Sequence, residues 1–158
     1  MNWPDVFLWG LVATLVLSTL LSASQATGVS RMSIPLLLGT LLTGDRDRAA
    51  AVGFLLHLVV GWGFALLYAL MFQSWGRAGR LLGAAVGLGH GLVVLVIVLP
   101  LLQGLHPRVA SERTGPEPTR ALEPPGFMGL NYGWATPLVT LIAHVLYGAI
   151  LGGGYRVV

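Results

Sequence analysis

The chain has 158 residues, of which 55% are hydrophobic and only 9% are charged, whereas an ordinary soluble domain carries about 25% charged residues. This composition excludes a soluble globular protein and indicates an integral membrane protein in contact with the lipid bilayer. The net charge of +3 comes from single arginines without a basic stripe, so we expect no nucleic-acid partner. The absence of cysteine excludes disulfides and thiolate metal sites.

Four apolar stretches are long enough to cross a hydrocarbon core about 30 Å thick, which takes roughly 20 helical residues. They are residues 6–24, 49–72, 81–102 and 136–155. Together they predict an all-α fold, an integral membrane four-helix bundle that forms a single transmembrane domain over residues 1–158.

The connection between the first two spans holds a further apolar segment, residues 33–43, which is too short to cross the membrane. Ser33 and Pro35 at its start are typical of the first residues of a helix. We therefore expect a short interfacial helix after the first span. Asp45 and Asp47 then fall near the start of the second span, where negative charge complements the helix dipole.

Two very different connections follow. The short turn QSWGRAGR makes the second and third spans an antiparallel hairpin, whereas the loop 103–135 is long, polar and rich in proline. Charges alternate along this loop, and we expect them to pair with the charged segment 45–48 to form a polar cap on the loop side of the bundle. The predicted cap consists of His106, Arg108, Glu112, Arg113, Asp45, Arg46, Asp47 and Arg48.

In every span, small or histidine residues recur four positions apart and so share one helix face. The series are Gly10, Thr14, Ser18 and Ser22; Gly53, His57 and Gly61; Gly83, Gly87 and Gly91; and His144, Gly148 and Gly152. Close backbone approach through small residues is how helices associate in lipid, so these faces predict a tightly packed bundle.

Three histidines lie inside the spans, and these are the candidate site. His57 and His144 lie on the small-residue faces and His90 lies beside one, so all three should face protein rather than lipid. At about 1.5 Å of rise per residue, His57 and His144 lie at similar depth, with His90 about a turn deeper. We expect His57 to face His144 across the bundle.

The histidines have several interpretations. They can simply bond neighbouring helices, or His57, His90 and His144 can hold haem iron or a transition metal in the bundle core. They can also form a proton or ion path together with His106. The spans contain no Asp, Glu or Arg to hold or drive an ion, which disfavours a pump.

An enzyme that acts at the membrane interface is a further alternative, because His106, Arg108, Ser111, Glu112 and Arg113 crowd together in the loop 103–135. Their spacing matches no nucleophile elbow and no H-E-x-x-H metal motif. We therefore assign no catalytic residue and do not expect an enzyme.

Three segments carry a family resemblance: GVSRMSIPLLLGTLLTGDRDRAAAVGFLLH, HPRVASE and LEPPGFMGLNYGWATPLVTLIAHVLYGAILG. In these segments, which fall within residues 28–155, the chain resembles a bacterial family of small four-span membrane proteins. The resemblance implies a fold and a location, which we take as the bacterial inner membrane. The family has no assigned activity, so no catalytic residue is carried over.

The number of spans is even, which puts both termini on one side of the membrane. Arginines are more numerous on the loop side, but there they alternate with acidic residues, and the GRAGR turn is the basic connection without acids. We favour cytoplasmic termini. For function, the sequence predicts a binding or accessory subunit with a histidine-lined core, joined to a membrane-protein partner or to a second copy.

Overall fold

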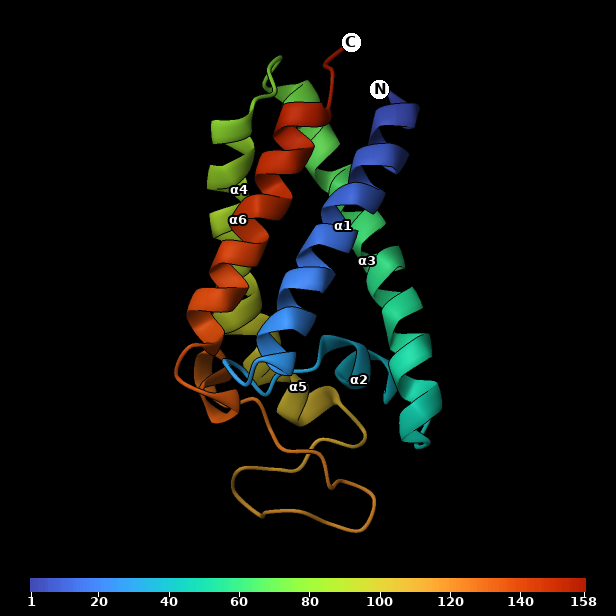
Figure 1. Ribbon diagram of the computed structural model, residues 1–158, viewed down its shortest axis with the longest axis vertical. Coiled ribbons are helices and arrows are strands. Elements are labelled where there is room, and N and C mark those ends of the chain that lie inside the picture. The colour runs from blue at the N-terminus through green and yellow to red at the C-terminus, as the bar shows by residue number, and fades with distance from the viewer.

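The computed structural model describes residues 1–158, and its regular secondary structure is helical, without a β-sheet (Figure 1). It confirms four helical segments long and apolar enough to span a membrane. These are α1 (Trp3–Ala26), α3 (Arg46–Ser74), the segment Arg80–Leu105, and α6 (Thr136–Gly154). The third segment consists of α4 (Arg80–Val93), the π-helical turn η1 (Val94–Val98) and α5 (Leu99–Leu105).

The first two spans begin earlier than predicted because polar residues cap them. The Asn2 side chain accepts a hydrogen bond from Asp5 N, and the Asp45 carboxylate accepts from the main-chain nitrogens of Asp47 and Arg48. A cap satisfies main-chain donors that the first turn leaves free. The helices therefore include charged residues ahead of the apolar stretches.

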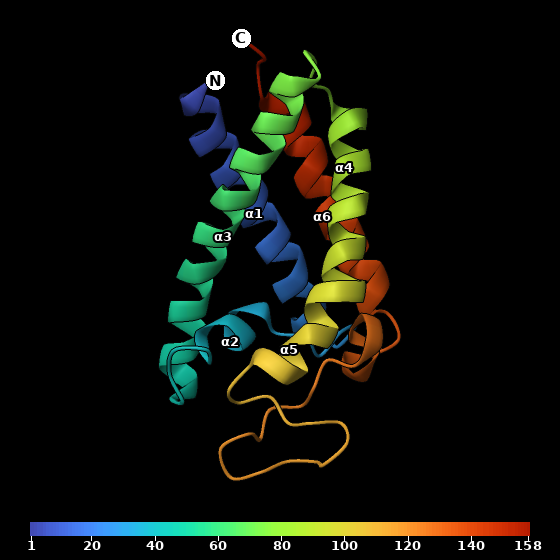
Figure 2. The ribbon, with the colours of Figure 1, turned by 180° about the vertical axis from the view of Figure 1, so that it is seen from behind.

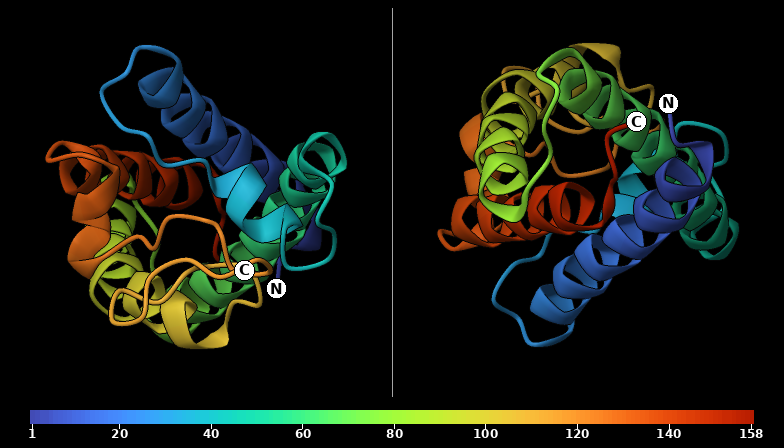
Figure 3. Two further views of the ribbon diagram at one scale, coloured as in Figure 1. Left: turned by 90° about the horizontal axis from the view of Figure 1, so that it is seen from below. Right: turned by 90° about the horizontal axis from the view of Figure 1, so that it is seen from above.

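Small residues hold α4 against α6, as their spacing predicts. Gly83 lies against the main chain of Gly148, and Gly87 lies against the main chain of His144, so that a side chain at either glycine would collide with a carbonyl group. Helix α1 packs between α6 and α3 (Figures 1 and 3). The small faces thus set the distances between the helices.

The short connection after α1 contains helix α2 (Ile34–Gly39), which is shorter than the predicted segment 33–43. It packs on α3, where Gly39 and Gly53 leave room for main-chain atoms of the other helix. Viewed from the loop side, α2 crosses the end of the bundle (Figure 3, left). Helix α2 therefore covers the loop-side end of the bundle.

Helices α3 and α4 are joined by a short turn, yet they are not packed along their length. Figure 2 shows them diverging toward the loop side, and no extensive packing joins α3 to α4, η1 or α5. The third span is also irregular at η1, where the helix forms a wider turn. Pro100 favours this turn, because it lacks a main-chain donor and its ring crowds the carbonyl group four residues earlier. The side of the bundle between α3 and the third span is thus loosely packed.

The loop 103–135 is folded rather than open. It contains the 3-10 helix η2 (Phe127–Tyr132) and an isolated bridge between Val109 and Leu122, and Val109 is fully buried. Its first residues, 103–105, complete α5. At the opposite end of the molecule Arg156 forms an ion pair with the buried Asp5 at 2.9 Å, which ties the two termini together.

Candidate functional site

A cavity of about 250 Å³ lies in the bundle core, and all three span histidines line it. Each spanning segment contributes to its walls, and α2 contributes Leu37 and Leu38. Most of the lining side chains are apolar. The cavity therefore places a few polar groups in an apolar surrounding, as small-molecule sites do.

A chain of hydrogen bonds fixes the protonation of His57. The Ser18 hydroxyl donates its proton to Thr14 O at 2.7 Å, and the same oxygen lies 3.0 Å from His57 Nδ1. Because Ser18 has only one proton to give, His57 Nδ1 must be the donor to Ser18. The proton of neutral His57 is thus on Nδ1, and its Nε2 carries a lone pair.

The same reasoning applies to His144. Its Nδ1 lies 2.8 Å from Thr140 O, and a carbonyl oxygen can only accept. His144 therefore donates through Nδ1, and its Nε2 also carries a lone pair.

His90 has the opposite arrangement. The Tyr68 hydroxyl lies 3.3 Å from His90 Nδ1 and has no other hydrogen-bond partner. A buried hydroxyl donates where it can, so Tyr68 donates to Nδ1 and the proton of His90 is on Nε2. The ring is held by stacking on Phe64, with ring centres 4.0 Å apart.

The Nε2 atoms of the three histidines have no hydrogen-bond partner within the chain. His57 and His144 thus offer two acceptors in this cavity, and His90 offers one donor. The Thr140 hydroxyl, also at the cavity, is buried without any partner. Unpaired polar groups in an apolar interior are costly, and a ligand that pairs with them removes that cost.

The predicted haem or metal site at His57, His90 and His144 is not supported by this arrangement. No three histidine, aspartate or glutamate side chains are placed to hold a metal ion. Metal–nitrogen bonds are about 2.0–2.1 Å long, so two imidazoles on opposite faces of a haem iron keep their ring centres roughly 6 Å apart or more. The ring centres of His90 and His144 are 4.7 Å apart, edge to face. His90 and His144 therefore cannot bind opposite faces of one haem iron, because the glycine contacts between α4 and α6 hold their rings together.

His57 and His144, which we expected to face each other across the bundle, line the same cavity. The structure adds a ring contact of His144 with His90 and a bond between His57 and Ser18 of α1. These two contacts depend on how the helices pack, which depth estimates along isolated helices do not include.

The cavity is least enclosed between α3 and η1. Phe64 and Tyr68 of α3 reach His90 on the turn side. Closer to the loop side, Val60 of α3 and Val98 of η1 both line the cavity, and each is 42% exposed. Apolar side chains of the cavity lining thus reach the outer surface of the bundle between these two elements.

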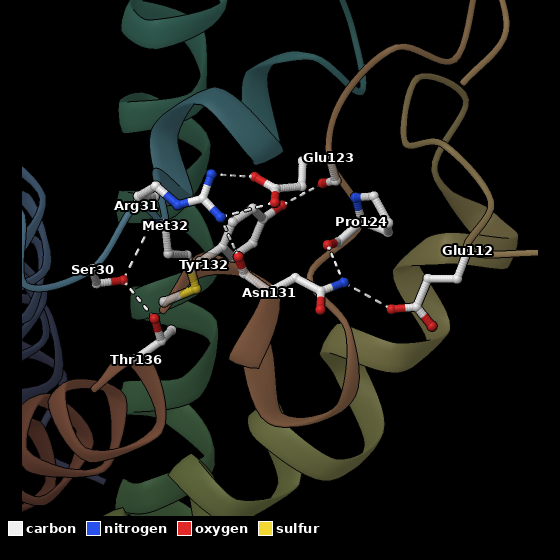
Figure 4. A network of polar contacts seen from close by, with 9 residues as sticks. All are labelled: Ser30, Arg31, Met32, Glu112, Glu123, Pro124, Asn131, Tyr132 and Thr136. Atoms are coloured by element: carbon white, nitrogen blue, oxygen red, sulfur yellow. Dashed lines mark hydrogen bonds and ion pairs between the residues drawn. The ribbon is translucent and has the colours of Figure 1, made fainter. Parts of the chain in front are cut away.

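The loop-side cap is held by different pairs from those expected. Arg31 forms a bidentate ion pair with Glu123 (Figure 4). The two nitrogen–oxygen distances are 2.9 and 3.0 Å. Asn131 in turn donates to Glu112 at 2.9 Å. Arg31, which the predicted cap did not include, thus anchors the loop.

The predicted ion pairs between the loop and the segment 45–48 are not formed. Asp45 instead caps α3 and pairs with Arg48 at 3.5 Å, whereas the side chains of Arg46, Asp47 and Arg113 have no ion pair or hydrogen bond within the chain. Capping satisfies the main chain of α3 and leaves Asp45 unavailable to the loop.

His106 is fully buried beneath the loop rather than exposed at its surface. Its Nδ1 accepts from Arg108 N at 3.1 Å, and its Nε2 donates to Leu37 O at 2.9 Å. Burial lowers the pKa of His106, and the charges of Arg108 and Arg120 lower it further, although the bond to Leu37 acts in the opposite direction. His106 is therefore neutral and joins the loop to α2.

No family model, curated protein or solved structure matches the chain.

Sequence analysis missed four polar residues at or beside this site: Ser18 as a partner of His57, and Tyr68, Thr140 and Tyr147. The two tyrosines carry a signal that could have found them. Tyrosine in a span is usually found at the membrane interface, yet Tyr68 and Tyr147 are buried within α3 and α6. The Tyr147 hydroxyl donates to Gly61 O at 2.6 Å.

Proposed function

We propose that this small polytopic membrane protein binds a lipid-soluble molecule that carries a hydroxyl group, with the histidine-lined cavity as the site. The observation that supports the proposal is the set of unpaired Nε2 atoms on His57, His90 and His144 in an apolar cavity. The protein then acts as a binding or accessory subunit rather than as an enzyme.

A hydroxyl group suits this set of histidines because it donates one hydrogen bond and accepts others. Its proton can go to the lone pair of His57 or His144, while its oxygen accepts from Nε2 of His90. An alcohol, a phenol or a hydroquinone has this chemistry. A ketone without a hydroxyl group can use only the donor of His90.

The size and the opening of the cavity favour a ligand that enters from the membrane. Its volume of about 250 Å³ is below the about 300–1,000 Å³ of pockets that enclose drug-sized molecules. The cavity therefore holds a polar head group, and the apolar remainder of the ligand lies between Val60 and Val98, toward the lipid.

The test is to purify the protein gently from its native membrane, extract it with organic solvent and identify the co-purified molecules by mass spectrometry. We expect a hydroxyl-bearing lipid in near-equal amount to the protein. The double variant His57→Leu, His144→Leu should retain about fivefold less, because the hydroxyl proton then has no acceptor and a neutral hydrogen bond contributes about 1 kcal/mol.

Val59→Leu is the matched control, because Val59 is 61% exposed on the same helix as His57. Equal retention by the double variant, with its helical circular dichroism intact, would refute the proposal. Elemental analysis of the same sample addresses the metal alternative, and a stoichiometric transition metal would favour it over a hydroxyl-bearing ligand.

The proposal places the protein in the bacterial inner membrane with cytoplasmic termini. Arg77 and Arg80 lie in a connection that contains no acidic residue, whereas the arginines on the loop side are interspersed with five acidic residues. Cysteines introduced at Ser74 and Thr119, both exposed, report the orientation. In intact cells an impermeant maleimide should label Thr119→Cys and not Ser74→Cys, and the reverse result would invert the topology.

A membrane-protein partner or a second copy belongs to the same proposal. Gly63 and Gly89 lie within spans and have open space where a side chain would be, which leaves small surfaces for another helix. Native mass measurement in a mild detergent should show a complex larger than one chain. A monomer under all mild conditions would count against the accessory role.

A further inference from the structure

A second and larger cavity lies outside the bundle core, on the loop side of the protein. Its volume is about 560 Å³, and it lies between the start of α3, the turn after α2 and the folded loop. Two arginines, Arg46 and Arg108, line it together with the polar residues Thr40 and Thr119. No aspartate or glutamate is among its lining residues.

Arg108 is held in place by several contacts, none of which is an ion pair with an acidic side chain. Its Nη1 donates to Thr40 O, its main-chain nitrogen donates to His106, and its carbonyl oxygen accepts from Leu122 N at 2.9 Å. Gly44 lies against the guanidinium group, where a side chain would come within 3.4 Å of Nε. A positioned group loses less conformational freedom on binding.

Arg46 supplies a second positive charge without a partner. It is exposed at the start of α3 and forms no ion pair. Of its two acidic neighbours, Asp45 is occupied by the helix cap and by Arg48, and Asp47 does not line the cavity. Arg46 is therefore free to turn toward an anion in the cavity.

The surroundings of Arg108 are also positive. Arg120 donates through Nη2 to His106 O at 3.1 Å, and the charges of Arg108 and Arg120 both lower the pKa of the buried His106. Among the acidic side chains elsewhere in the cap, Glu123 pairs with Arg31 and Glu112 with Asn131. Asp47 and Glu117 have no such partner, but neither lines the cavity. The lining of the cavity thus carries two arginines and no acidic residue.

We propose that Arg46 and Arg108 bind a phosphate group in this cavity. Guanidinium groups match phosphate oxygens through paired, charge-assisted hydrogen bonds. The phosphate can belong to the head group of an anionic lipid, since the cavity lies at the loop-side end of the spans, or to a soluble phosphate compound. This site is separate from the histidine cavity and does not depend on its ligand.

The experiment compares the two sources in the intact protein reconstituted in nanodiscs. In discs of phosphatidylcholine, inorganic phosphate is titrated by calorimetry. In discs that also contain phosphatidylglycerol, native mass spectrometry counts the anionic lipids retained after the disc is removed. The variants are Arg46→Gln and Arg108→Gln, and the control is Arg113→Gln, which removes a loop arginine that does not line the cavity.

We expect the wild-type protein and Arg113→Gln to bind one of the two probes equally, and each cavity variant to bind it about tenfold more weakly, as loss of a hydrogen bond to a charged group predicts. Binding of inorganic phosphate identifies a soluble ligand, and retention of phosphatidylglycerol alone identifies a lipid head group. Arg108→Gln also loses its bond to Thr40 and can loosen the loop. Arg46→Gln is therefore decisive, and equal binding by Arg46→Gln and wild type would overturn the proposal.

Discussion

The imidazole of His90 lies edge-on against the imidazole of His144, with ring centres 4.7 Å apart. The two residues belong to the neighbouring antiparallel helices α4 and α6. Glycines make this contact possible. Gly87 lies against His144 O, and a side chain at Gly91 would come within 3.1 Å of His144 Cβ. The small face of α4 thus both joins the helices and positions the candidate site.

Gly87→Ala should therefore destabilise the protein. The new methyl group collides with the main chain of α6, and overpacking of this kind costs about 1–3 kcal/mol. Gly89→Ala is the control, because open space surrounds Gly89 on the same helix. A thermal unfolding scan in detergent should show a lower midpoint for Gly87→Ala only, and equal midpoints would contradict the close packing of α4 on α6.

Ser18→Ala should change the protonation of His57 without unfolding the protein. The variant removes the only acceptor of the His57 Nδ1 proton, so the proton can move to Nε2 and one acceptor of the cavity is lost. Nitrogen NMR of labelled imidazoles reports the tautomer, and retention of the co-purified hydroxyl lipid should fall less than in the double histidine variant, because His144 still offers a lone pair. Ser22→Ala on the same helix should leave both measurements unchanged, because Ser22 is exposed and forms no side-chain hydrogen bond.

Acid should loosen the loop side through His106. Its folded pKa is lowered, so the unfolded chain binds the proton more readily, and the stability that neutral His106 contributes is present above its ordinary pKa of about 6.5. It is lost as the pH falls below that value, because a proton on Nδ1 breaks the bond from Arg108 N.

The measurement is the thermal midpoint at about pH 7 and about pH 5, on either side of the ordinary histidine pKa. His106→Gln should be less stable than wild type at neutral pH but should lose less on acidification. A variant with the same pH dependence as wild type would show that another group titrates.

The folded loop should resist protease as long as Glu123 pairs with Arg31. Glu123→Gln weakens an ion pair whose side chains are 62% and 45% exposed, so we expect a cost of about 1 kcal/mol or less. Cleavage by trypsin after Arg113 should then become severalfold faster, because docked loops are cut slowly. Glu117→Gln is the control, since the Glu117 side chain has no hydrogen bond or ion pair. Rapid cleavage of wild type would mean that the loop is loose.

The sequence by itself indicated a membrane protein, the number of apolar spans and the close packing of helices through small residues. These features depend on local composition and on spacing along one helix: about 20 apolar residues span a membrane, and residues four apart share a face. The spacing placed Gly83 and Gly148 each on a small-residue face, and in the structure these two faces meet. The three histidines could be assigned to the protein interior for the same reason.

Only the tertiary structure decided how the histidines are used and which charges hold the loop. The roles of Ser18 and Tyr68 depend on the tilt of α1 and α3 and on the gap between α3 and η1, which no periodicity encodes. Arg31 reaches Glu123 because the loop folds back over α2, and Asp45 is unavailable because it caps its own helix. Hydrogen bonds and ion pairs depend on distances between atoms far apart in the chain, and those distances are fixed only when the helices pack.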